Sequence, residues 1–189
     1  MPKRLFIALP LPVPVKAELN ALIQIGQRQA PPVRWVRPEQ MHVTLKFLGD
    51  VEEQREERLT AALEAVTGIS PFVFNLAGVG AFPNRQRPRV VWTGIDSGCR
   101  EVAALAARVD EALAPCGFPR EERPFSPHVT IGRVKQPGEF AGFWQAVDAA
   151  PYVGQPVDAC EVKLVHSTLT PKGPLYADLA AFPLRGKRD

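Results

Sequence analysis

The sequence is poor in the residues that define disulfide-rich, zinc-binding and membrane-spanning proteins. Its three cysteines among 189 residues, Cys99, Cys116 and Cys160, are odd in number, widely spaced and in no CxxC pair. This argues against a disulfide framework or a zinc-binding cysteine cluster and indicates reduced thiols in a cytosolic protein. Prolines interrupt the apolar run over residues 5–15, and no other run is long enough to cross a bilayer. We therefore expect a cytoplasmic protein without a membrane segment.

The beginning of the chain has two features of a signal peptide but lacks the third. Lys3 and Arg4 precede the apolar run, as in a signal peptide, yet no cleavage site of small residues follows it. The next segment is amphipathic and carries Lys16 and Glu18. These residues favour a first strand that ends in a turn.

The charge balance is only weakly biased. Lys and Arg total 23 against 20 Asp and Glu, which gives a net charge of +3 and a pI near 8.9. This mild excess is compatible with a phosphate-bearing ligand. Apolar residues make up 46% and charged residues 23% of the chain, as in ordinary globular proteins. The length suits one domain, or two small lobes that share a core.

Hydrophobic periodicity predicts alternating strands and helices. Residues spaced as on one face of a helix, or alternating as in a strand, lie between Gly- and Pro-rich breaks. The pattern predicts strands at 4–9, 33–36, 41–48, 72–79, 89–95, 128–134, 157–169 and 175–182, and helices at 13–29, 52–66, 100–113 and 140–149.

Two copies of one short motif stand out, HVTL at residues 42–45 and HVTI at 128–131. Successive side chains of a strand point to opposite faces, so His and Thr two residues apart share one face. The apolar residues between them point to the other face and bury. Each motif therefore presents an imidazole and a hydroxyl on a common surface. The chain has only three histidines, and two of them have this context.

The spacing of the motifs predicts the architecture. They lie 86 residues apart, close to half the chain, and strands and helices alternate around each. We expect an α+β fold of two related lobes, each a mainly antiparallel sheet flanked by helices, with an active-site cleft between them. The single domain would span residues 1–189.

Two imidazoles facing one cleft suit acid/base chemistry at phosphorus. A free histidine has a pKa of about 6.5, so near neutral pH one ring can act as base and the other as acid. Thr44 and Thr130 would donate hydrogen bonds to phosphate oxygens, and no metal is required. Arg133 would pair with the phosphate, provided that a bulge or the end of the strand near Gly132 rotates it to the face of His128. Strict alternation places Lys46 on the face of His42.

The sequence resembles the two-histidine (2H) phosphoesterases, in particular the bacterial and archaeal RNA 2′,3′-cyclic phosphodiesterases, also called 2′-5′ RNA ligases. The matching features cover almost the whole chain in the order of that family. They are RLFIAL at residues 4–9, Trp35, HVTLKFLG at 42–49, FPN at 82–84, PRVVW at 88–92, PHVTIGR at 127–133, and S-x-L-x-P-x-G-P-x-Y at 167–176.

The resemblance implies hydrolysis of a 2′,3′-cyclic phosphate at an RNA 3′ end, or of a cyclic nucleotide, to a 2′-phosphomonoester. It assigns His42 as general acid and His128 as general base, with phosphate contacts from Thr44, Thr130 and Arg133. The reverse reaction would join RNA ends through a 2′-5′ linkage. The resemblance implies a bilobal fold. We further expect a monomer that needs no cofactor or metal.

Two other functions fit the sequence. One is a nucleotide- or RNA-binding module with a vestigial cleft. The other is the same chemistry on small cyclic nucleotides or 2′-5′ oligonucleotides. A metal site at the two histidines is disfavoured, because neither motif has Asp, Glu or Cys at ligand spacing.

Several further residues have both a structural and a functional interpretation. His166 lies in a partial third copy of the motif, and we expect it to be a structural or a surface residue. The three arginines of the 85–89 segment fit a solvated hairpin and an RNA-backbone contact equally well. For Trp35, Phe47 and Trp92 we expect core packing rather than stacking on a base.

Overall fold

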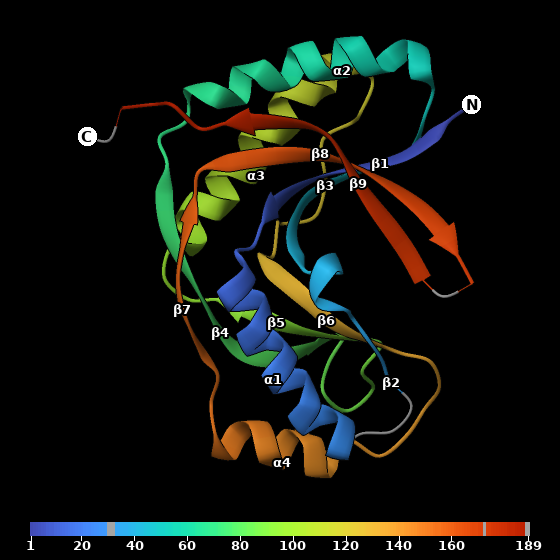
Figure 1. Cartoon of the computed structure of the whole chain (residues 1–189), viewed down its shortest axis with the longest axis vertical. Coiled ribbons are helices and arrows are strands. Elements are labelled where there is room, and N and C mark those ends of the chain that lie inside the picture. Colours follow the sequence, from blue (N-terminus) through green and yellow to red (C-terminus); the bar gives the residue numbers. More distant parts are fainter. Residues whose placement is uncertain (30–32, 172, 188–189) are drawn as a thin grey trace.

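The computed structural model describes residues 1–29, 33–171 and 173–187. The described strands form one curled antiparallel sheet in the order β7-β4-β5-β6-β3-β1-β8-β9, and β2 pairs with β6 (Figure 1). The strands are β1 (Lys3–Pro10), β2 (Val33–Trp35), β3 (His42–Val51), β4 (Phe72–Phe82), β5 (Val90–Ile95), β6 (His128–Val134), β7 (Val153–Ala159), β8 (Glu161–Thr170) and β9 (Gly173–Pro183). The helices are α1 (Val13–Gln29), α2 (Glu56–Leu63), α3 (Cys99–Leu113) and α4 (Ala141–Ala149).

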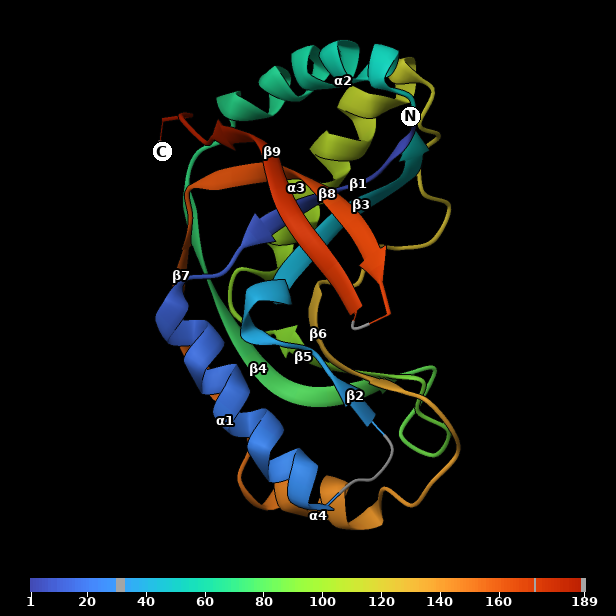
Figure 2. The same ribbon diagram turned by 45° about the vertical axis from the view of Figure 1, so that its right-hand side comes forward.

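The sheet consists of two halves that meet at β3 and β6. The only residues paired between these strands are Val43 and Val129, each the second residue of its motif. Helices α2 and α3 pack together on the half that contains β3, whereas α1 and α4 pack together on the half that contains β6 (Figures 1 and 2). The α+β class and the two-lobed arrangement are thus confirmed, with the two sheets joined into one.

Most predicted elements are present, but two boundaries were wrong. The helix expected at 52–66 is α-helical only over Glu56–Leu63 and has a 3-10 turn on either side. The extended segment expected at 157–169 is two strands, β7 and β8, separated at Cys160. Strand β7 pairs with β4, whereas β8 pairs with β1. The break therefore marks the point where the chain crosses between the halves.

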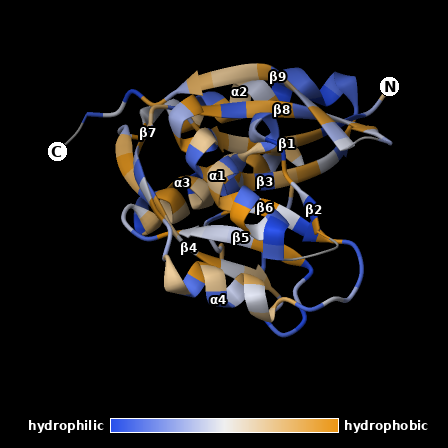
Figure 3. Ribbon diagram, turned by 60° about the horizontal axis from the view of Figure 1, so that its bottom comes forward, coloured by the Kyte–Doolittle hydropathy of each residue, from blue (hydrophilic) through white to orange (hydrophobic). Residues whose placement is uncertain are grey.

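The apolar core lies between the sheet and the helices. Apolar residues concentrate on the strands and on the inward faces of the helices (Figure 3). The ring of Trp35 of β2 packs closely against two glycines. A Cβ atom would lie 2.5 Å from the ring if placed on Gly26 and 3.0 Å from it if placed on Gly132. Close packing of this kind fixes β2 against β6. None of the helices in the described residues is long and apolar enough to span a membrane.

Candidate active site

A cavity of about 480 Å³ opens between the two halves, with both motifs in its wall. All five predicted site residues line it: His42, Thr44, His128, Thr130 and Arg133. The rest of its wall comes mainly from β2, β9 and the segment that precedes β6. Polar and aromatic side chains from these parts include Arg34, Trp35, Arg123, Phe125 and Tyr176, and Gln40 adds a further one from the 3-10 turn before β3.

His42 is held on both sides and at both ring nitrogens. Its Nδ1 donates to the carbonyl oxygen of Gln40 at 2.8 Å, because a carbonyl can only accept. In the neutral ring Nε2 then carries no proton and accepts a hydrogen bond from the Thr44 hydroxyl at 3.0 Å. The ring stacks on Phe6 at 4.7 Å and meets the edge of Tyr176 at 5.4 Å. These contacts fix one tautomer and one ring orientation.

His128 repeats the arrangement in the other half. Its Nδ1 donates to the carbonyl oxygen of Ser126, two residues earlier, at 2.7 Å. Its ring meets Phe82 edge-on at 5.0 Å and lies 6.3 Å from the ring of Trp92. Both imidazoles therefore use Nδ1 as an anchor, so that Nε2 of each neutral ring remains basic.

A bulge after each motif threonine sets which side chains reach the cavity. In β6 the pairing to β5 passes from Thr130 directly to Gly132, and Ile131 is left without a partner. This extra residue reverses the alternation, so Arg133 pairs with Val90, which also lines the cavity. The interruption of the strand that the sequence required to bring Arg133 to the face of His128 is thus present as a bulge.

Strand β3 has the equivalent bulge, at Leu45. Here it overturns the alternation that placed Lys46 beside His42. Lys46 borders the cavity, but it pairs with Ile7 of the core. The next residue, Phe47, occupies the position equivalent to Arg133; it lines the cavity and is 65% exposed. Core packing was therefore the wrong expectation for Phe47.

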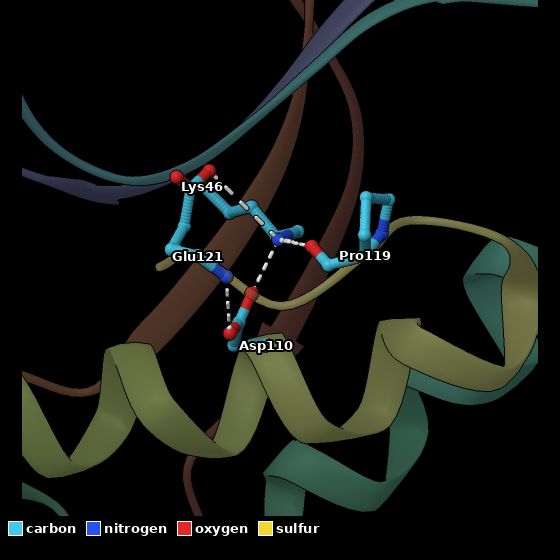
Figure 4. A network of polar contacts seen from close by, with 4 residues as sticks. All are labelled: Lys46, Asp110, Pro119 and Glu121. Carbon is cyan, nitrogen blue, oxygen red and sulfur yellow. Dashed lines mark hydrogen bonds and ion pairs between the residues drawn. The ribbon is translucent and has the colours of Figure 1, made fainter. Parts of the chain in front are cut away.

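The ammonium of Lys46 is the centre of a buried polar network (Figure 4). Lys46 is 4% exposed; it forms an ion pair with Asp110 of α3 and donates to the carbonyl oxygen of Pro119 at 2.8 Å. The other Asp110 oxygen accepts from the backbone N–H of Glu121 at 3.0 Å. The network therefore ties the motif strand to α3 and to the segment that lines the cavity before His128.

Positive charge and burial both act against protonation of the imidazoles. Burial is the main cause that lowers the pKa of His42 to about 4; the positive charges of Lys16, Arg133 and a protonated His128 act in the same direction, and the hydrogen bond to Gln40 opposes them. Burial also lowers the pKa of His128, with a smaller contribution from Arg133, and the bond to Ser126 opposes this. The free site is therefore built around two neutral rings at neutral pH and a nearby guanidinium.

The other residues to which the sequence gave two interpretations can now be placed relative to the cavity. His166 does not line the cavity. Trp35 packs against Phe143 and also lines the cavity, and Trp92 packs against Phe82. Arg85 chelates Asp148 with two bonds of 2.9 Å and covers the ring of Trp144. Within the described ranges, no three His, Cys, Asp or Glu side chains converge as metal ligands would.

The sequence alone assigned no site role to several residues that line the cavity or contact its histidines. Phe6 and Tyr176, which hold the ring of His42, lie in strands that were predicted, but their approach depends on the pairing of β1 with β3 and β8. Arg34 and Arg123 also reach the cavity without a local motif that marks them. Both are basic side chains close in sequence to a motif strand, Arg34 in β2 and Arg123 in the segment before β6.

This arrangement defines a class of site. A cavity with two anchored imidazoles, two hydroxyls and guanidinium groups binds an oxyanion and moves protons on two sides of it. Among proteins this combination is suited to phosphoester chemistry. The comparisons with known proteins lead to the same class.

The family model described as LigT like Phosphoesterase matches residues 9–92 and 95–176. The chain is 37% identical to an RNA 2′,3′-cyclic phosphodiesterase of Archaeoglobus fulgidus, over 95% of this chain and 99% of that one. It is 35% identical to the enzyme of the same name from Methanothermobacter thermautotrophicus, over 97% and 100%. The chain belongs to the LigT-like phosphoesterase family, the 2H phosphoesterases predicted from the motifs.

Solved structures agree over almost the whole chain. A protein of Thermus thermophilus superposes with a TM-score of 0.80 at 31% identity and covers 98% of this chain and 100% of its own. Escherichia coli LigT complexed with 3′-AMP superposes with a TM-score of 0.77 at 26% identity, over 97% and 99%.

Removal of Asp110 should destabilise the fold strongly. Asp110→Ala leaves the buried Lys46 ammonium with only the exposed carboxylate of Glu121, 4.0 Å away; loss of the close partner of a buried charge typically costs about 3–5 kcal/mol. Asp148→Ala is the matched control, because it breaks the exposed pair with Arg85 and should cost about 1 kcal/mol or less. Urea unfolding measures both. Adding Lys46→Met to Asp110→Ala should recover part of the loss; a double variant less stable than Asp110→Ala would contradict this account.

The burial of His42 should make stability depend on pH. Because its pKa is about 4 in the folded chain and about 6.5 when unfolded, the unfolded chain binds more protons between these values. The stability contributed by the neutral ring is present above pH 6.5 and is lost as the pH falls toward 4. It amounts to about 2 kcal/mol between pH 7.5 and 5. Urea unfolding at both pH values measures this. The free energy of unfolding of the wild type should fall by about 2 kcal/mol more than that of His42→Gln between pH 7.5 and 5, and an identical pH dependence of the two proteins would refute the prediction.

Proposed function

We propose that this chain is an RNA 2′,3′-cyclic phosphodiesterase that hydrolyses 2′,3′-cyclic phosphate ends to 2′-phosphomonoesters. The observation that carries the proposal is the pair of imidazoles in one cavity, each anchored at Nδ1 and each two residues before a threonine that also lines the cavity. The names of the relatives from Archaeoglobus and Methanothermobacter support the substrate class, as does the 3′-AMP complex of E. coli LigT.

In the proposed reaction His128 acts as general base. Its basic Nε2 removes a proton from water, and the water oxygen forms a bond to phosphorus. The bond from phosphorus to the 3′ oxygen breaks on the opposite side, and His42 gives its proton to that departing oxygen. The product carries a 2′-phosphate and a 3′-hydroxyl. Two correctly placed groups of this kind each contribute about 10²–10⁴-fold in rate.

Binding of the anionic substrate favours protonation of His42, which the free site disfavours. A phosphate close to the ring favours its charged form, and the low pKa of the free ring makes it a strong acid at the transition state. Once Nε2 is protonated it donates, so the hydroxyl of Thr44 is released from Nε2 and turns to the phosphate. Thr130 and Arg133 hold the remaining non-bridging oxygens.

The same groups can run the reaction backward. If a 5′-hydroxyl replaces water and the two histidines exchange roles, the product is a 2′-5′ linkage. Both directions use proton transfer by protein side chains, so we propose that neither needs a metal. We also propose a cytoplasmic monomer, with residues 1–189 as one domain of two pseudo-symmetric lobes. The same order of buried and exposed positions in β3 and β6 supports this symmetry.

The test is hydrolysis of RNA that ends in a 2′,3′-cyclic phosphate. We expect the wild type to retain its rate in EDTA and His42→Ala or His128→Ala to lower kcat by about 10²–10⁴-fold. His166→Ala, outside the cavity, is the matched control and should keep the wild-type rate. Loss of activity in EDTA with recovery on adding a divalent metal would refute the two-histidine mechanism. Binding of RNA without product would favour the vestigial module.

A further inference from the structure

A second cavity, of about 490 Å³, lies where the loop between β4 and β5 meets the segment that follows β6. Its polar wall consists of Gln86, Arg87, Arg89, Lys135 and Gln136, and no carboxylate is among the residues that line it. Glu139 belongs to the same segment but does not line the cavity. The polar wall therefore offers positive charges and amides only.

The three cationic side chains are available to a ligand. Arg87, Arg89 and Lys135 are exposed, and within the described residues none of them forms an ion pair. The loop that carries Arg87 is nevertheless held in place, because the Asn84 side-chain oxygen accepts the backbone N–H groups of Gln86 and Arg87. Arg85, in contrast, is occupied by Asp148. Arg85 thus fixes the loop to Asp148, whereas Arg87 and Arg89 remain accessible to a ligand.

This second cavity adjoins the candidate active site along β5 and β6. Val90 and Arg133, which pair with each other, line the first cavity. The adjacent residues, Arg89 and Val134, are joined by a backbone hydrogen bond of 2.9 Å and line the second. Lys135 follows Arg133 by two residues, or about 6.6 Å of extended chain. This distance is of the order of one step between successive phosphates of an extended RNA strand.

We propose that the second cavity binds the phosphodiester backbone of single-stranded RNA, one or a few nucleotides before the cyclic phosphate in the active site. Clustered Arg and Lys side chains bind RNA mainly through its phosphates, and the amides of Gln86 and Gln136 hydrogen-bond the ribose hydroxyls. This inference rests on the proposed function and extends it: the enzyme selects RNA ends over mononucleotides by contacts that only a polynucleotide can make.

The experiment compares substrates of different length in two matched variants. Arg87→Gln/Lys135→Gln removes two charges from the second cavity. Arg28→Gln/Arg100→Gln removes two exposed charges elsewhere. We measure kcat/KM for 2′,3′-cyclic AMP and for RNAs of two, four and eight nucleotides that end in a 2′,3′-cyclic phosphate, at several salt concentrations.

We expect the first variant to lose about tenfold in kcat/KM on the four- and eight-nucleotide RNAs and less than twofold on cyclic AMP. The slope of log kcat/KM against log salt should become shallower by about 0.7 for each phosphate contact removed. The control variant should retain the length preference of the wild type. Equal effects on cyclic AMP and RNA, or no effect on either, would overturn the inference and leave the proposed function intact.

Failure of the proposed function has a different signature. If the wild type hydrolyses none of these substrates, binding of a fluorescein-labelled eight-nucleotide RNA with a 3′-phosphate still tests the cavity. Anisotropy should then show weaker binding for Arg87→Gln/Lys135→Gln than for the control variant. Equal affinities of the two variants would overturn the inference.

Discussion

The site depends on one contact, the pairing of Val43 with Val129, where the two halves of the sheet meet. Both valines are fully buried, and in each strand a histidine and a threonine flank the valine on the opposite face. Burying the two apolar side chains therefore brings both pairs of polar groups to one surface. The helices behind the sheet, the anchoring carbonyls and the aromatic rings then fix the orientation of each imidazole. The hydrophobic core and the polar cavity are two faces of the same short strands.

Charge sets the character of that cavity. The imidazoles are buried and close to cations, so the free site resists protonation, and an anionic ligand removes this resistance. Arg133, whose charge lowers the pKa of both rings, also lines the cavity, where it is placed to attract an anionic ligand. The positive charge continues beyond the site through Arg89 and Lys135. Lys46 lies four residues after His42, but it adds little to the positive charge of the cavity because Asp110 compensates its charge.

Local sequence predicted the two motifs, their shared face and most of the strands, because alternation and β-branched residues act over a few positions. Strict alternation did not correctly place the residues beyond the first four positions of each motif; Arg133 was predicted at the site only through an interruption of the strand and the family resemblance. Alternation alone placed Lys46 in the site and left Arg133 out, and a bulge in each strand reverses both placements. Long-range pairing decides such positions. The separation of β7 from β8 and the approach of Tyr176 to His42 have the same origin, since both depend on partners distant in the chain.

In the proposed mechanism His42 protonates the 3′ oxygen while His128 directs water to the other side of phosphorus. Phosphorus NMR of the product formed in water labelled with heavy oxygen tests this most directly, because it reports which ester bond breaks and where the new oxygen enters. The two-histidine mechanism predicts a 2′-phosphomonoester that carries one labelled oxygen on phosphorus. A 3′-phosphomonoester, or a product whose phosphate holds no label after one turnover, would contradict it.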